Sequence, residues 1–198
     1  MSHYRNSEDL VIRFSTQVKA VGGYFTSLTN FAEVTEYVSK LASTMKARRI
    51  AVSGAGLSSP LLVPKLLIPC DLISLANMER ADFFEALKSA EIGVTCADLG
   101  VAETGTLIIA TTDELDRLVT ALPLLHVAIL PRSKLVFALD DAQKRISQLL
   151  MNTSAAVSIS LISASSRTSD VGGISILGAH GPKELHVLLL DQDLPGGL

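Results

Sequence analysis

The sequence of 198 residues predicts an α/β fold with a mainly parallel sheet. Apolar segments of strand length alternate with segments whose apolar residues recur at helical spacing. Several of the strand-like segments are apolar throughout, which is typical of parallel strands that are buried on both faces. Apolar residues make up 48% of the chain, which is enough to fill a core without disulfides or bound metal.

Two helices are expected in the N-terminal part. The first ends at Gly22 and Gly23, and the second begins after Asn30. Asn30 and Glu33, three residues apart, are typical of a capping box at a helix start. The apolar residues at helical spacing are Leu10, Val11, Phe14 and Val18 in the first helix and Phe31, Val34, Tyr37, Val38, Leu41 and Met45 in the second.

The rest of the chain alternates between strand-like and helix-like segments. Residues 92–112 predict a strand, a turn and a strand, because they are rich in β-branched residues and interrupted by glycines. Further strands are expected in RRIAVSG (48–54, leading into a Gly/Ser loop), DLISL (71–75), HVAILPR (126–132), AVSISLISA (156–164) and ELHVLLLD (184–191). Helices are expected in ERADFFEALKSA (79–90), DELDRLVTAL (113–122) and DDAQKRISQLLM (140–151). This pattern suggests a helical arm (1–22), one domain (23–191) and a flexible tail (192–198).

Composition excludes several classes of function. The formal net charge is −3 and only 19% of residues are charged, so a nucleic-acid surface is not expected. Cys70 and Cys96 form no CxxC pair, and the histidines show no metal-ligand spacing, so no metal or iron–sulfur cluster is expected in this chain. The N-terminus lacks the signal-peptide pattern, and no apolar run could span a bilayer, so we expect a cytoplasmic protein.

The first candidate site is the AETGT segment, residues 102–106. Thr104 and Thr106 supply hydroxyls, Gly105 allows close approach of a ligand to the backbone, and Glu103 is a candidate base or nucleophile. The alternative is a plain hairpin turn in which Gly105 adopts a positive φ.

The second candidate is SSRTSD, residues 165–170, which follows an apolar strand. Ser166, Arg167 and Thr168 combine a planar cation with hydroxyl donors, which suits a carboxylate or a phosphate. In open α/β sheets, ligands bind beyond the carboxyl ends of the strands. The alternative is a solvated loop in which Asp170 pairs with Arg167.

The third candidate is GAHGP, residues 178–182. Gly178 and Gly181 flank His180, and Pro182 fixes the exit of a tight turn. His180 could orient or protonate a ligand, or it could be an exposed turn residue. His126 and His186, in contrast, are expected to be strand residues with polar neighbours.

Four segments in this order resemble the LUD-domain family, most closely its stand-alone lactate utilization protein C type. They are CADLGVAETGTLII, DRLVTALPLLHVAIL, SSRTSDV and LGAHGPKELHVLLLD, within residues 93–191. The resemblance implies the three-layer α/β/α sandwich shared by NagB, ribose-5-phosphate isomerase and the CoA transferases. It also implies a non-iron–sulfur subunit that acts in oxidation of L-lactate to pyruvate with two iron–sulfur partner proteins. In that case the clusters belong to the partners, and this chain carries no cofactor of its own.

We further predict that the three candidate segments converge at one end of the sheet and hold a small anion such as lactate in one pocket. Its catalytic candidates are Glu103 and His180, and its ligand-binding candidates are Thr104, Gly105, Thr106, Ser166, Arg167, Thr168, Asp170, Gly178 and Gly181. Relatives more often have Gly-Pro where this chain has Ala164-Ser165, and an acidic residue in place of Gly172. Two other functions stay open: an enzyme acting on a phosphorylated, folate-like or CoA-linked substrate, and a structural assembly subunit.

Overall fold

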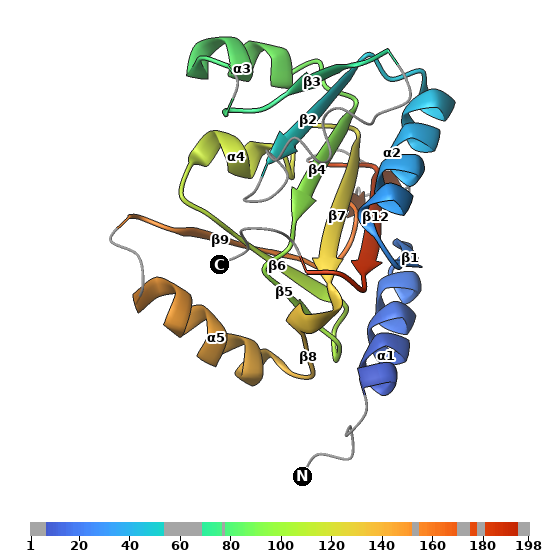
Figure 1. The fold of residues 1–198 in the computed structure, drawn as a ribbon, viewed down its shortest axis with the longest axis vertical. Helices are drawn as coiled ribbons and strands as arrows, with labels where there is room; N and C mark the ends of the chain where they lie inside the picture. The colour runs from blue at the N-terminus through green and yellow to red at the C-terminus, as the bar shows by residue number, and fades with distance from the viewer. Residues whose placement is uncertain are drawn as a thin grey trace.

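A computed structural model describes residues 7–53, 69–76, 78–151, 155–169, 175–177 and 181–193 (Figure 1). Its centre is a six-stranded sheet with the strand order β1-β12-β7-β4-β2-β3, and every neighbouring pair in it is parallel. The strands are β1 (Tyr24–Leu28), β2 (Arg49–Ser53), β3 (Asp71–Ile73), β4 (Ile92–Cys96), β7 (Leu125–Pro131) and β12 (Glu184–Leu190). The prediction of an α/β fold with a mainly parallel sheet is confirmed.

A second sheet of four strands, in the order β8-β5-β6-β9, lies beside the first. It comprises β5 (Leu99–Val101), β6 (Thr106–Thr111), β8 (Leu135–Val136) and β9 (Ser158–Ile162). Strand β6 pairs antiparallel with both β5 and β9. Residues 92–112, expected to be a strand, a turn and a strand, therefore contain three strands divided between two sheets. A short hairpin of β10 (Arg167–Ser169) and β11 (Ser175–Leu177) follows β9.

Helices cover the sheets from both sides (Figure 1). Helix α2 (Phe31–Met45) packs on one face of the central sheet. Helix α1 (Ser7–Ala20) and the second sheet pack on its other face, where α1 inserts the fully buried Phe14 and Val18. Helices α3 (Arg80–Leu87) and α4 (Glu114–Leu118) cover the far end of that face. Helix α5 (Leu139–Met151) covers the outer side of the second sheet.

The start of α2 shows how the local sequence sets the structure. Oδ1 of Asn30 accepts hydrogen bonds from the backbone N–H groups of Ala32 and Glu33, as the capping pattern predicts. The Glu33 carboxylate accepts the backbone N–H of Thr29, the residue before the cap, rather than that of Asn30. The capping prediction is therefore confirmed, with the reciprocal bond shifted by one residue.

Two expectations for strands need correction. The sequence interpretation did not assign β1, which lies at the edge of the central sheet and whose residues are exposed or half-buried except for Leu28. The segment 156–164, expected to be a buried strand, forms β9 at the edge of the second sheet, where Leu161 is 56% exposed. Edge position explains both errors, because such a strand is packed on fewer sides than a central one.

Within the described residues, no helix is long and apolar enough to cross a membrane.

Candidate functional site

A pocket of about 290 Å³ lies where the end of β9 meets the start of β12. One wall is the segment 160–166, and Gly181 and Pro182 form the rim that adjoins it at Ser166. Thr120, Ala121, His126 and Leu185 complete the described lining. In size it is at the lower end of the range for small-molecule sites.

The pocket lies at the amino ends of the central strands. His126 is the second residue of β7, and Leu185 pairs with it as the second residue of β12. The SSRTSD segment was expected beyond the carboxyl end of a parallel strand. It instead follows β9, whose partner in the second sheet is antiparallel. The rule for ligands in open parallel sheets therefore does not apply to it.

Backbone contacts bring the second and third candidate segments together. The N–H of Ser166 donates a hydrogen bond of 2.9 Å to the carbonyl oxygen of Pro182. A Cβ atom added at Gly181 would lie 3.2 Å from Cβ of Ser166, so the two segments are in close contact. Arg167 continues directly into β10, where it pairs with Leu177.

The predicted site residues of the second and third segments fall into three groups. Ser166 and Gly181, with Pro182, line the pocket. Arg167 and Thr168 are placed by their backbone in β10, directly after the pocket wall. Asp170, Gly178 and His180 lie outside the described residues.

The AETGT segment is a tight turn that reaches the pocket through hydroxyls. Gly105 has a φ of 70°, as the hairpin alternative predicted, and a Cβ there would lie 2.8 Å from Cβ of Gln17 in α1. Oγ1 of Thr106 lies 2.7 Å from Oγ1 of Thr104 and 2.9 Å from Oγ of Ser163. Because Ser163 lines the pocket, Thr106 supports its wall.

Glu103 is exposed at this turn, and its backbone N–H donates to the carbonyl oxygen of Phe137. Among the described residues, the pocket lining includes neither Glu103 nor Thr104. The turn therefore contributes a supporting hydroxyl of Thr106, while the carboxylate of Glu103 lies outside the lining.

His126 is the pocket residue whose role sequence reasoning missed. Its Nε2 atom lies 2.8 Å from Oγ1 of Thr95 in β4, which confirms the expected polar neighbour. The side chain is only 1% exposed, and burial lowers the pKa of His126 to about 4, so the ring is neutral near pH 7. A histidine at the start of a fully apolar strand was the signal that could have identified it.

His186 occupies the opposite face of β12 and belongs to a separate cluster. Its Nδ1 atom lies 2.9 Å from the Tyr37 hydroxyl, and its Nε2 atom lies 3.0 Å from Oε2 of Glu184. The Tyr24 ring stacks on the imidazole with centroids 4.3 Å apart. The expectation of a polar neighbour for His186 is confirmed.

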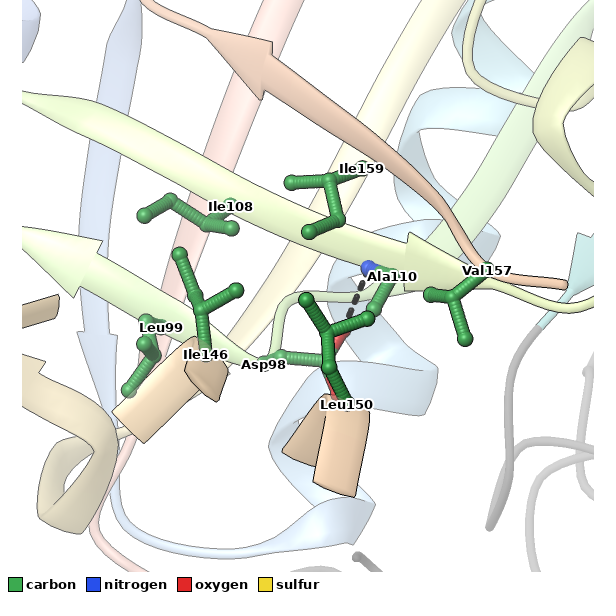
Figure 2. A pocket seen from close by; sticks show the side chains of 8 residues that line it. All are labelled: Asp98, Leu99, Ile108, Ala110, Ile146, Leu150, Val157 and Ile159. Carbon is green, nitrogen blue, oxygen red and sulfur yellow. Dashed lines mark hydrogen bonds between the residues drawn. The ribbon is translucent and has the colours of Figure 1, made fainter. Parts of the chain in front are cut away.

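A second hollow, entirely apolar except for one carboxyl group, lies between α5 and the second sheet (Figure 2). It has room for about one water molecule. The Asp98 carboxylate at its edge accepts a 2.7 Å hydrogen bond from the backbone N–H of Ala110, and burial raises the pKa of Asp98. This hollow is the packing seam of α5 and is too small for an organic ligand.

Thiols and metal-ligating groups are dispersed in the structure. Cys70 and Cys96 are half-buried free cysteines, and burial raises the pKa of both thiols. In the part of the chain that the structure describes, no three His, Cys, Asp or Glu side chains gather in a way that could hold a metal ion.

Comparison with known proteins places the chain in a family. The family model of the LUD domain matches residues 11–190. This chain belongs to the LUD domain family. The match includes the described lining of the pocket, the AETGT turn and most of α1.

Bacterial relatives within this family have lactate utilization in their names. "Lactate utilization protein C" of Shouchella clausii is 29% identical over 137 residues, which are 69% of this chain and 57% of that protein. "Lactate utilization protein C" of Bacillus subtilis is 31% identical over 113 residues, which are 54% of this chain and 47% of that protein. The chain thus spans about half the length of these relatives.

A solved structure shares the fold. The crystal structure of a DUF162 family protein from Deinococcus radiodurans matches with a TM-score of 0.65 and 18% sequence identity. The match covers 93% of this chain and 98% of that one, so it shows that the LUD chain and the Deinococcus protein have the same overall fold.

Proposed function

We propose that this LUD-domain chain acts in lactate utilization, as a subunit without an iron–sulfur cluster that binds a small hydroxycarboxylate. The relatives named "Lactate utilization protein C" support the pathway. The observation that best supports a ligand site is the hydrogen bond from the backbone N–H of Ser166 to the carbonyl oxygen of Pro182. This bond holds the second and third candidate segments together beside one pocket.

In the proposal, the residues next to this hydrogen-bonded contact bind the ligand and take its proton. Arg167 directly follows Ser166, and a guanidinium at the pocket rim would bind the ligand carboxylate with two parallel hydrogen bonds. His180 directly precedes Gly181 and is assigned as the base that takes the proton of the α-hydroxyl group. Glu103 is not assigned as the base of this pocket, because its carboxylate lies outside the described lining.

Oxidation of L-lactate to pyruvate releases two electrons and two protons, so the proposal also needs an electron acceptor. The base takes the hydroxyl proton. The α C–H bond breaks, its proton passes to water, and its two electrons would pass one at a time to the iron–sulfur clusters of two partner proteins. The role of this chain is then to bind and orient the substrate beside those partners.

Isothermal titration calorimetry with L-lactate, pyruvate and phosphate tests the ligand site. We expect the wild-type chain to bind L-lactate and Arg167→Ala to weaken binding about 10- to 100-fold, as for a lost hydrogen bond to a charged group. Arg13→Ala, an exposed arginine on α1, is the matched control and should bind as the wild type does.

Growth on L-lactate separates a binding subunit from a structural one. Deletion of the gene should abolish growth on L-lactate, and complementation with Arg167→Ala or His180→Ala should not restore it. Full growth of both variants would instead show an assembly subunit whose pocket is not used.

A further inference from the structure

His126 has one ring nitrogen in the protein interior and the other open to the pocket. Nε2 is occupied by Thr95. Nδ1 has no hydrogen-bond partner in the described part of the chain. Among the described residues, the only fully buried side-chain nitrogen or oxygen without a partner is Oγ1 of Thr111. The unpartnered Nδ1 is therefore in contact with open space, and the open space beside this ring is the pocket.

The hydrogen bond with the Thr95 hydroxyl determines which ring nitrogen of His126 carries the proton. Thr95 is 1% exposed, and within the described residues the hydrogen-bond partner of its hydroxyl is Nε2 of His126. If Nε2–H donated to Thr95, the hydroxyl proton of Thr95 would be buried without an acceptor, which is costly. The hydroxyl therefore donates to Nε2, and the proton of the neutral ring is on Nδ1.

We propose that the Nδ1–H group of His126 is a carboxylate-binding donor of the pocket, and that the ligands of this site are small carboxylates. This inference rests on the proposed function only for the choice of lactate as the ligand. The described lining is compatible with this class, because it contains no carboxylate that would repel an anion. Ser160 and Ser165 add hydroxyls that make no side-chain hydrogen bond in the described part of the chain. Such a lining offers donors to an anion and offers no charged acceptor to a cation.

Two substitutions at His126 separate the two ring nitrogens. In His126→Asn, the short amide places an N–H donor near the position of Nδ1, but it does not reach Thr95. In His126→Gln, the longer amide reaches the position of Nε2 and keeps an acceptor for Thr95, while the Nδ1 donor is lost. We expect His126→Gln to weaken L-lactate binding about 10- to 100-fold and His126→Asn to stay within about threefold of the wild type.

Nitrogen-15 NMR of the wild-type protein tests the same inference without a substitution. The two ring nitrogens of His126 should show the Nδ1–H tautomer at pH 7, and the Nδ1–H signal should shift when L-lactate or acetate is added. An Nε2–H tautomer would overturn the inference. This measurement also holds if either variant fails to fold.

The outcomes distinguish this inference from the proposed function. Lactate binding that is equally strong in His126→Gln would overturn the role of His126 and leave the lactate site standing. A response of His126 to acetate or pyruvate, with none to L-lactate, would support the donor and overturn lactate as the ligand. No response to any of these carboxylates would overturn both.

Discussion

The backbone N–H of Ser166 and the carbonyl oxygen of Pro182 are joined by a hydrogen bond of 2.9 Å. Ser166 follows β9 of the second sheet, and Pro182 precedes β12 of the central sheet, so the bond joins the two sheets at one point. The pocket lies beside this junction. Its shape therefore depends on how closely these two segments approach each other.

Gly181→Ala should widen this junction. The added Cβ would lie 3.2 Å from Cβ of Ser166, which is closer than such atoms normally pack. We expect L-lactate affinity to fall about 3- to 10-fold, with a loss of unfolding free energy of about 1 kcal/mol, near the lower end for overpacking. Calorimetry and urea unfolding measure the two effects.

Ser166→Gly in the same protein serves as the matched control for Gly181→Ala. Removal of the Ser166 Cβ relieves the crowding, so the double variant should be more stable than the sum of the single effects predicts. Additive effects would show that the two residues are not in contact.

The hydroxyl chain beside the pocket should make a measurable contribution to stability. Thr106→Val keeps the side-chain shape but removes the hydroxyl that contacts both Thr104 and Ser163. Since Thr106 is 6% exposed, we expect a loss of about 1 to 2 kcal/mol in unfolding free energy. Thr104→Val, at an exposed position, should cost less than half as much. Equal effects of the two substitutions in urea unfolding would contradict the proposed support of the pocket wall.

The buried neutral His126 should make the protein less stable in acid. Its folded-state pKa of about 4 lies below the ordinary value near 6.5, so the unfolded chain binds the proton first. The contribution of His126 to the free energy of unfolding is fully present above pH 6.5. It decreases by about 3 kcal/mol in total as the pH is lowered toward 4. His186, whose pKa burial also lowers, adds a loss in the same direction.

Urea unfolding of the wild type and His126→Gln between pH 7 and pH 4 measures this contribution. The variant has no ionisable group at this position, so its stability should fall less steeply as the pH decreases. Parallel curves for the two proteins would show that His126 is not neutral and buried in solution.

Asp98 should have the opposite pH dependence. Burial raises the pKa of Asp98 in the folded state, so its ionisation destabilises the fold as the pH rises through that pKa. Asp98→Asn keeps an acceptor for the N–H of Ala110, and relative to the wild type it should be more stable at pH 7 than at pH 3. Asp98→Ala removes the acceptor and should be destabilised at both pH values. A difference between Asp98→Asn and the wild type that does not change with pH, measured by urea unfolding, would contradict the raised pKa.

The central sheet and its helices could be predicted because their signals are local. The apolar run that follows His126 in β7 predicts a strand that is buried on both faces, and the Asn30 cap predicts the start of α2. The tight turn at Gly105 followed from the need for a positive φ there.

The division into two sheets could not be predicted, because it depends on contacts between distant residues. Strand β4 and strand β5 are separated by only two residues, yet they belong to different sheets. The role of His126 escaped prediction for the same reason. Its environment is made by Thr95 and by the wall residues near Ser163, which the chain brings together only in the folded state.

A crystal structure of the protein with L-lactate is the most direct test of the pocket. We predict density for one lactate molecule between the wall 160–166 and the rim at Gly181, with a carboxylate oxygen within hydrogen-bond distance of Nδ1 of His126. Lactate bound at the carboxyl ends of the central strands, or an empty pocket at saturating lactate, would contradict this assignment.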